Sequence, residues 1–458
     1  MGGIIAQDGF DYQLWDGLIR LPAWLADPAF EELIFEGLED LEARFFAPQA
    51  PRGRLLERYQ AKGGTLSPAE VREVLEGFLA FETVYPEAAR VHALVTPRMP
   101  PTVSWLARDP NRVRNARPFY APFADIAAAS DNELRQRLLT SYGGELGAFV
   151  AAAVEVSERN LPELDAAVAQ FDTKLTRTFP SLDASRRRVA DAFAALSELA
   201  RRSIGVPLSA NLLTRTIEQA LGTNLGLPTV FPLHIRSDKN EEDAHALQID
   251  AAAFSGGSGE FPDRSGWSAL TAALDTTSRW LQSRGTSRIR LSGSYRLTTA
   301  FLIGWKFRSA IGFELDIPMR SGNWSTDQHP LPGPGLPWKI KSPSALVAGR
   351  LVVGIGILRD PASEIVRQLQ LADEQNVLLA QLPQALSNGI EVQSSLQIVK
   401  SAITEAVGRL HPQAIDIYYV GPAAFAVALG HRWNGFPVTQ LNEFLQAHRK
   451  YVATASTD

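Results

Sequence analysis

The sequence predicts an α/β protein: a mixed-sheet core with a helical bundle, followed by two Rossmann-like units. The chain of 458 residues is long enough for two or three domains of roughly 100–200 residues each. Strand-like runs surround one helix near the N-terminus, a helical stretch follows, and strands then alternate with helices. We therefore expect domains at 1–122, 123–225 and 226–458, the last with halves of about 226–335 and 340–458.

The elements of the first core follow from its hydrophobic periodicity. An apolar repeat predicts a helix over residues 8–25, and short apolar runs predict strands at 33–35, 55–60 and 91–95. A second helix is expected to begin at Ser67–Glu70, because Ser, Pro and Glu suit its N-cap, first and third positions. The predicted order is strand, strand, helix, strand.

The remaining chain divides at the turn-rich segment Gly222–Pro228. Before it, apolar residues at helical spacing predict a bundle with few strand formers. After it, the predicted elements are strand 288–291, helix 296–309, strands 311–317 and 350–357, a helix from about 362, strand 376–381, helix 395–409, strand 415–420 and helix 422–431. Such alternation predicts mostly parallel sheets and two related units, although no sequence repeat is evident.

Composition excludes several classes of site. The chain has no cysteine, which excludes disulfides, thiolate zinc sites and cysteine nucleophiles. Its seven histidines are scattered, so a metal would be a hard cation on oxygen ligands. No apolar run approaches the roughly 20 residues that span a bilayer, and no signal peptide is evident, so we expect a cytoplasmic protein without a membrane partner. The net charge of -5 neither supports nor excludes DNA binding.

Acidic, amide and basic side chains recur at the ends of the first two strands. Gln60 and Lys62 lie two residues apart and therefore project from one face, and strand pairing would bring them near Asp40. This set suits phosphodiester hydrolysis: Asp40 binds Mg²⁺, Gln60 offers an oxygen or orients water, and Lys62 stabilises developing charge. Solvated strand ends are the alternative interpretation.

Two further regions carry residues that suit phosphate. One loop-like stretch holds four arginines that suit DNA phosphates without reading sequence, although a solvated basic loop is the alternative; they are Arg108, Arg112, Arg114 and Arg117. In the C-terminal part, two strand-to-helix loops offer free N–H groups. The candidate ligand-binding residues there are Ser292, Gly293, Ser294, Tyr295, Arg296, Lys306, Trp324, Arg359, Gly421, Pro422, Ala423 and Arg432. Each also has an ordinary structural interpretation.

A dinucleotide fold of the NAD type is not favoured. Gly354 and Gly356 imitate the start of the glycine fingerprint, but Arg359 replaces the third glycine.

Several motifs together resemble known families. Gly9–Gln13, Glu36–Asp40 and Tyr59–Lys62 resemble the nuclease domain of effectors from cyclic-oligonucleotide-based anti-phage signalling systems (CBASS), a restriction-endonuclease-like branch in which Gln-x-Lys replaces Glu-x-Lys. The resemblance implies catalytic roles for Asp40, Gln60 and Lys62. Gln13 matches the helix motif and is expected to orient the catalytic site, with a structural Gln as the alternative. The family often has two Asp residues where this chain has Glu39–Asp40, which makes Glu39 a second candidate acid and metal ligand. We expect Asp40 to be the main ligand.

The C-terminal part is similar to the SAVED domain, a fusion of two CARF-like units. The motifs that carry this similarity are Ser292–Ser294, Thr298–Phe307, Gly322–Trp324 and, most specifically, Ile417–His431. The two resemblances cover about residues 5–100 and 226–458. Together they imply a double-stranded DNA endonuclease that uses Mg²⁺ or Mn²⁺ and is activated when a cyclic di- or trinucleotide promotes homo-oligomer formation.

Two other functions compete with this one. The first is a ligand-sensing scaffold with an inactive nuclease fold, against which Asp40, Gln60 and Lys62 argue. The second is a constitutive restriction-type nuclease, which the lack of a basic helix or zinc module in 226–458 disfavours. No catalytic pair suggests that the C-terminal part cleaves its own ligand.

Overall fold

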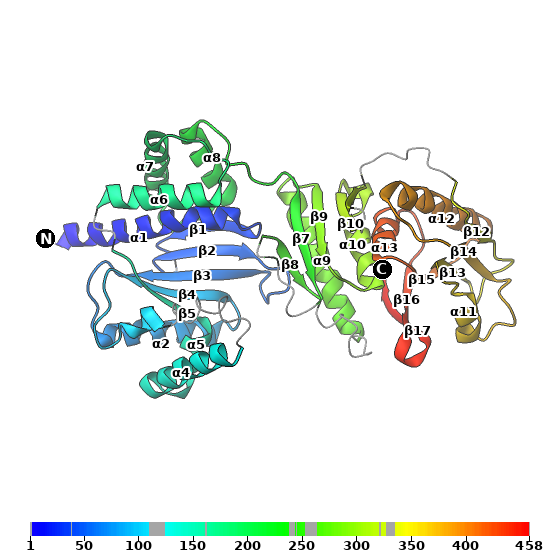
Figure 1. Cartoon of the computed structure of the whole chain (residues 1–458), viewed down its shortest axis with the longest axis horizontal. Coiled ribbons are helices and arrows are strands. Elements are labelled where there is room, and N and C mark those ends of the chain that lie inside the picture. Colours follow the sequence, from blue (N-terminus) through cyan, green and yellow to red (C-terminus); the bar gives the residue numbers. More distant parts are fainter. Residues whose placement is uncertain are drawn as a thin grey trace. The chain divides into compact units, whose positions relative to one another are not determined.

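The chain folds into two compact units, Met1–Leu227 and Pro228–Asp458 (Figure 1). The computed structural model describes residues 2–37, 39–109, 124–160, 163–237, 243, 245–251, 263–319, 322–326 and 335–457. In this part of the chain, no helix is long and apolar enough to cross a bilayer.

The first unit is built on a six-stranded mixed sheet with the order β5-β4-β3-β2-β1-β6. Its strands are β1 (Phe30–Phe35), β2 (Leu41–Phe46), β3 (Arg54–Ala61), β4 (Ala89–Thr96), β5 (Val154–Glu158) and β6 (Leu208–Ser209). Strands β1 to β3 form an antiparallel meander, and β4 and β5 continue parallel to β3.

Strand β2 is absent from the expected strand order. Charged residues interrupt its apolar pattern, but Arg44 pairs with Glu32 at 2.7 Å and with Glu42 at 2.5 Å, which neutralises them within the sheet. Strands β5 and β6 come from the stretch expected to be helical, so that stretch belongs to the same sheet.

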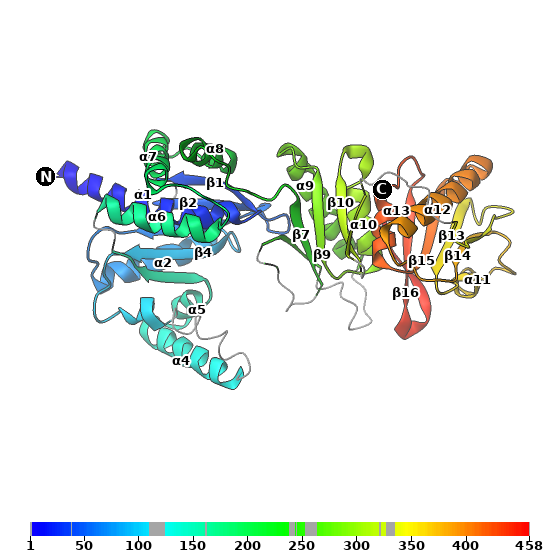
Figure 2. The same cartoon turned by 45° about the horizontal axis from the view of Figure 1, so that its top comes forward.

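Helices cover both faces of this sheet. They are α1 (Gly2–Ala26), α2 (Pro68–Val84), α4 (Ala124–Tyr142), α5 (Gly144–Ala153), α6 (Leu164–Thr178), α7 (Arg186–Arg202) and α8 (Ala210–Leu221). Trp24 of α1 contacts Tyr59, whereas Phe81 of α2 contacts Arg58, the preceding residue. Because successive residues of a strand face opposite sides, α1 and α2 lie on opposite faces. Helix α6 runs along α1 in both views (Figure 2). The expected capping box at Ser67 and Glu70 is confirmed.

The second unit contains two sheets, and the prediction of two Rossmann-like units is confirmed. The first sheet has the order β11-β10-β9-β7-β8 and consists of β7 (Phe231–Arg236), β8 (Leu247–Asp250), β9 (Arg288–Gly293), β10 (Glu314–Met319) and β11 (Gly322–Ser325). The second has the order β12-β14-β13-β15-β16-β17 and consists of β12 (Lys339–Lys341), β13 (Arg350–Ile357), β14 (Val377–Leu382), β15 (Ala414–Val420), β16 (Thr439–Leu445) and β17 (Lys450–Ser456). Among the described residues of this second unit, antiparallel pairs occur only at the sheet edges.

The helices of this unit are α9 (Arg264–Ser283), α10 (Leu297–Lys306), α11 (Ala362–Leu369), α12 (Gly389–Leu410) and α13 (Ala423–His431), with 3₁₀ turns η2 (Ser309–Ile311) and η3 (Gln446–His448). Helix α12 begins six residues earlier than expected, because the Asn388 side chain caps it by accepting a bond from Glu391 N at 3.0 Å.

Helices α10 and α13 cross with a reciprocal geometry that relates the two halves. A Cβ on Gly304 would lie 2.6 Å from His431 N, and a Cβ on Gly430 would lie 2.9 Å from Trp305 N. Each glycine therefore meets the residue that follows the other glycine. The contact is thus reciprocal at this point, whereas the internal duplication itself stays a prediction from the sequence pattern.

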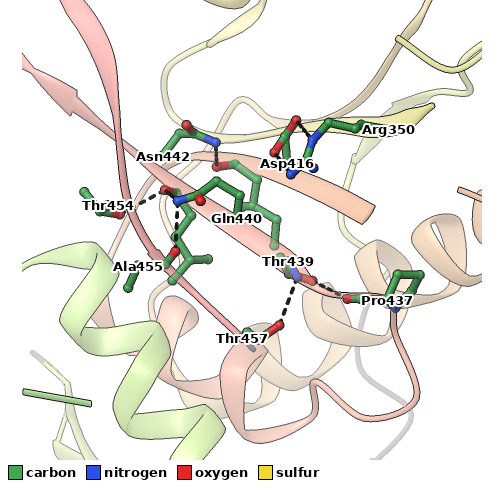
Figure 3. Close-up of polar contacts among 11 residues, drawn as sticks. Arg350, Asp416, Pro437, Thr439, Gln440, Asn442, Thr454, Ala455 and Thr457 are labelled. Atoms are coloured by element: carbon green, nitrogen blue, oxygen red, sulfur yellow. Dashed lines mark hydrogen bonds and ion pairs between the residues drawn. The ribbon is translucent and has the colours of Figure 1, made fainter. Parts of the chain in front are cut away.

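The hairpin of β16 and β17 forms one edge of the second sheet, and polar side chains link its strands (Figure 3). A bulge separates Gln440 and Asn442 in β16, and the Gln440 amide bridges it by donating to Ala455 O at 3.1 Å and Leu441 O at 2.9 Å. Arg350 and Asp416 form a two-bond ion pair at 2.7 and 2.6 Å between β13 and β15.

Candidate active site and ligand-binding loops

Asp40 lies in the turn between β1 and β2 and faces the end of β3. Its Oδ2 accepts hydrogen bonds from Gln60 Nε2 at 3.0 Å and from Ala61 N at 2.7 Å. Leu41 pairs with Tyr59, which sets Asp40 beside Gln60. The expected juxtaposition is therefore present, although β2 rather than β1 pairs with β3.

Lys62 directly follows β3 and continues its pairing, since its N–H bonds to Val95 O at 2.9 Å. Burial raises the pKa of Asp40, and the nearby Lys62 ammonium, the Ala61 N–H and the two Gln side chains oppose that rise. Burial also raises the pKa of Glu36 and Glu39, and Lys62 again opposes it. The lysine charge therefore lies among all three carboxyl groups of the turn.

Gln13 reaches this site from α1. Its amide donates to Ala61 O at 3.4 Å and also bonds to Asp40. Its Oε1 is buried and has no hydrogen-bond partner within the described residues. An oxygen acceptor without a partner among those residues thus lies beside the half-buried Asp40 carboxylate, and such a buried group calls for a ligand or water to satisfy it.

Glu39 bonds to a different residue of β3 than Asp40 does. Its Oε1 accepts a bond from the Arg58 guanidinium, and the Arg58 side chain is only 3% exposed. Sequence reasoning missed Arg58, yet its position two residues before Gln60 places it on the same strand face.

The donor set fits a hard divalent cation. Asp40 supplies a carboxylate, and the Gln13, Gln60 and Ala61 carbonyls are neutral oxygen donors of the type such ions accept. Within the described ranges, no group of three or more acidic or histidine side chains could hold a metal. Neutral oxygens beside one carboxylate are therefore the fitting ligand set at this turn.

The predicted DNA-contact loop is described in part. Arg108 is exposed and pairs with Asp109 at 3.2 Å. Arg112, Arg114 and Arg117 lie outside the described residues.

In the second unit, topology gives the predicted loops their position. Strand β7 lies between β8 and β9, and β13 lies between β14 and β15, so the chain reverses its direction of sheet growth at each point. Ligands of parallel sheets bind outside the carboxyl ends of strands at such switch points. Ser292–Ser294 end β9 or follow it, Arg359 follows β13, and Gly421–Ala423 follow β15.

Residues of β7 and the residue that follows it hold the loop after β9 in place. Gly293 has φ +89° and leaves no room for a Cβ against the Ile235 carbonyl. Ser292 Oγ lies 2.9 Å from His234 Nδ1, and the Ser294 carbonyl accepts a bond from Ser237. Burial raises the pKa of the neighbouring Tyr295 hydroxyl, which is half-buried.

Arg296 does not present an open cation to a phosphate. It pairs with Glu443 at 3.1 Å, and the second oxygen of Glu443 accepts from Thr298 N at 3.3 Å. The carboxylate thus occupies the N-terminus of α10, where the sequence predicted a ligand phosphate. No local pattern points to Glu443, because it lies 147 residues from Arg296.

Trp324 and Lys306, two further residues predicted to bind the ligand, make contacts within the fold. Trp324 is 4% exposed, and a Cβ on Gly389 would lie 2.7 Å from its Nε1, so the indole is a core group rather than a stacking surface. Lys306 lies at the opposite end of α10 from Arg296 and pairs with Asp275 at 3.2 Å. A role of Trp324 and Lys306 in ligand binding stays a prediction.

The remaining predicted residues keep polar groups at or near the surface. Arg359 pairs with Glu364 at 2.5 Å and remains 43% exposed. Tyr419 donates to Pro422 O at 2.7 Å, which fixes the loop before Ala423. Arg432 donates to Thr326 O at 2.9 Å at the far end of α13. Burial lowers the pKa of Lys400, missed by sequence reasoning, and the Arg432 charge adds to this effect.

The sequence of the second unit matches a known sensor family. Residues 273–456 match the SMODS-associated and fused to various effectors sensor domain, SAVED. This part of the chain is thus similar to SAVED domains.

Similarity extends over the whole chain. CD-NTase-associated protein 4 from an Acinetobacter species and from Moraxella osloensis are each 23% identical to it, over 99% of this chain and 97% of theirs. The Acinetobacter baumannii Cap4 SAVED/CARF-domain containing receptor with the cyclic trinucleotide 2'3'3'-cAAA has a TM-score of 0.81 at 20% identity, covering 98% of both chains. The Moraxella osloensis receptor gives 0.76 at 19% identity, covering 99% of this chain and 100% of that one. The chain is thus similar to CD-NTase-associated protein 4 over its full length.

Proposed function

We propose that this chain is a CBASS effector that cleaves double-stranded DNA in a metal-dependent reaction when it binds a cyclic oligonucleotide. The carrying observation is the Asp40 carboxylate, which is held by Gln60 and Ala61 with the Lys62 charge beside it. We place the reaction in the cytoplasm, where its DNA substrate is accessible.

The site residues divide the work of hydrolysis. Asp40, with the carbonyl oxygens of Gln60, Ala61 and Gln13, would hold Mg²⁺ or Mn²⁺, and the bound ion would polarise the phosphodiester and lower the pKa of a water. Lys62 stabilises the negative charge that develops on the phosphate. Gln60 fixes the Asp40 carboxylate, and Gln13 ties α1 to the same point.

The ligand proposal rests on the second unit. The compared Acinetobacter baumannii receptor holds the cyclic trinucleotides 2'3'3'-cAAA and 3'3'3'-cAAA. We infer that this chain binds a cyclic di- or trinucleotide at its strand-to-helix loops. We expect Ser292–Ser294, Tyr295, Arg359 and Gly421–Ala423 to contact it, and their position at the switch points supports this assignment. Ligand binding would promote homo-oligomer formation if the ligand prefers the assembled form.

The test is cleavage of supercoiled plasmid with Mg²⁺ across a panel of cyclic di- and trinucleotides, with particle size measured in parallel. Wild type should cut with one nucleotide and grow in size. Lys62→Ala should lose at least about 100-fold in rate, as expected for removal of a charge-stabilising group. Lys174→Ala, at an exposed lysine of α6, is the matched control and should cut normally.

Other outcomes identify the competing functions. Nucleotide binding without cleavage would indicate a sensing scaffold. Cleavage without any nucleotide would indicate a constitutive nuclease.

A further inference from the structure

Glu39 and Asp40 are adjacent in sequence but have different partners. Asp40 bonds to β3 at Gln60 and Ala61, whereas Glu39 bonds to Arg58 of the same strand. The turn that carries both is tight: Glu36 N donates to Asp40 O at 2.9 Å, and Gly37 N donates to Glu39 O at 3.0 Å. Glu36 adopts φ +53°, a left-handed conformation that costs energy for a residue with a side chain.

Arg58 belongs to a series of polar contacts that also includes Glu39, His92 and Glu82. Its guanidinium stacks on the Phe81 ring at 3.5 Å, and its Nη1 lies 3.4 Å from His92 Nδ1. Since Arg58 can only donate, His92 accepts at Nδ1 and donates from Nε2 to Glu82 Oε2 at 3.2 Å. The sequence of contacts runs from α2 through β4 and β3 to the turn that holds Asp40.

The buried Arg58 guanidinium needs a carboxylate partner, and Glu39 is that partner. A buried guanidinium without a carboxylate is strongly unfavourable. Burial lowers the pKa of Arg58, and the carboxylates of Glu39, Glu42 and Glu82 oppose that effect, Glu39 most strongly. Glu42 also bonds to Arg44, and Glu82 bonds to His92, which leaves Glu39 as the direct ion-pair partner.

We propose that Glu39 is a positioning residue rather than a metal ligand. Its ion pair with Arg58 anchors the turn to β3 and thereby fixes the Asp40 carboxylate against Gln60 and Ala61. This inference rests on the proposed nuclease function, and it assigns the metal to Asp40 alone among the two acids.

The test measures Mn²⁺ affinity and cleavage rate separately, on the full chain. Mn²⁺ binding is followed by titration calorimetry, and kcat is followed on plasmid with the activating nucleotide. Asp40→Asn should lose Mn²⁺ binding. Glu39→Gln should keep Mn²⁺ affinity within about threefold while kcat falls about 10- to 100-fold, since small misplacement of a catalytic group costs that much.

A double variant tests the pair itself. Arg58→Gln should lower kcat about as much as Glu39→Gln, and the losses should not multiply in the double variant, because both changes remove one ion pair. The double variant removes both charges of the pair and therefore leaves neither partner unpaired. It should fold even where a single variant does not, and circular dichroism checks this. Glu76→Gln removes the exposed ion pair with Arg72 and is the matched control, expected to change neither quantity.

Two results would overturn the proposal. Loss of Mn²⁺ binding in Glu39→Gln equal to that in Asp40→Asn would make Glu39 a metal ligand and leave the nuclease function intact. Multiplicative kcat losses would show that Glu39 and Arg58 act independently. Failure of wild type to bind Mn²⁺ or cut DNA would instead reject the nuclease function on which the proposal rests.

Discussion

At the scale of single residues, the candidate active site of the first unit centres on one half-buried carboxylate and its neighbours. Asp40 is stabilised in its charged form by Lys62, by the Ala61 N–H and by the two amides, but burial outweighs them and raises its pKa. The group therefore binds protons more readily than an ordinary Asp. A bound cation would remove this preference, because metal ligands must be deprotonated.

We expect Mn²⁺ affinity to fall on acidification at a pH above the ordinary Asp value of about 3.9. Because Asp40 has a raised pKa, protons compete with the metal earlier than at an exposed Asp. Lys62→Ala should move the loss to still higher pH, since the lysine charge opposes the rise. Calorimetric titrations from about pH 5 to 8 test this, and an unchanged pH profile in Lys62→Ala would contradict it.

A buried histidine in the second unit gives a separate dependence of stability on pH. His431 Nδ1 contacts Phe307 O at 2.7 Å, and burial lowers the pKa of His431 to about 4. The unfolded chain takes up a proton near the ordinary value of about 6.5. Between these values the unfolded chain binds more protons, so the free energy of unfolding falls as pH falls.

We expect His431 to contribute a loss of up to about 3 kcal/mol between those two pH values. Urea denaturation across this range measures it. His431→Asn should be less stable at neutral pH but should lack this part of the pH dependence. A variant that follows the wild-type pH curve in parallel would show that other groups titrate there.

At the scale of elements, α10 and α13 pack closely where they cross in the second unit. Glycine is needed at both contact points, because the facing backbone atoms leave no space for a Cβ at Gly304 or Gly430. Thr298, Phe301, Tyr419 and Leu429 line a small cavity beside the crossing. The two halves are thus joined by backbone proximity as well as by apolar packing.

We expect Gly430→Ala to lower the free energy of unfolding by about 1–3 kcal/mol, the usual cost of overpacking. Gly408→Ala on α12 is the matched control, since a Cβ there meets nothing within 4 Å. That change should stabilise by about 0.5–1 kcal/mol, because alanine favours helices over glycine. Chemical denaturation measures both, and equal effects at the two sites would contradict the crossing geometry.

At the scale of the whole molecule, the chain consists of two compact units with separate cores and separate candidate sites. The candidate nuclease residues all lie in the first unit, and the candidate nucleotide loops all lie in the second. A nucleotide that binds the second unit must therefore act on the first by favouring one conformation or assembly.

Nucleotide binding should first appear as stabilisation of the second unit. At about 100 times Kd the expected gain is about 2.7 kcal/mol. Scanning calorimetry should show one transition move upward while the other stays, and Lys62→Ala should give the same shift. Equal shifts of both transitions would indicate that the ligand also binds or couples to the first unit in the absence of DNA.

The sequence by itself determined the fold class and the core of the candidate active site. Strand and helix periodicity, the capping box at Ser67 and the spacing of Gln60 and Lys62 are local signals. Because Gln60 and Lys62 lie two residues apart, they share one face of a strand. Pairing of that strand within a sheet is then enough to bring them near Asp40.

Tertiary structure decided which partner each polar side chain takes. It inserted β2 beside β3, gave Glu39 to Arg58, gave Arg296 to Glu443 and placed Trp324 against Gly389. These pairs join residues that are distant in the chain, and burial of charge determines which of them form. Local periodicity carries no record of such contacts, because they arise only when separate elements pack together.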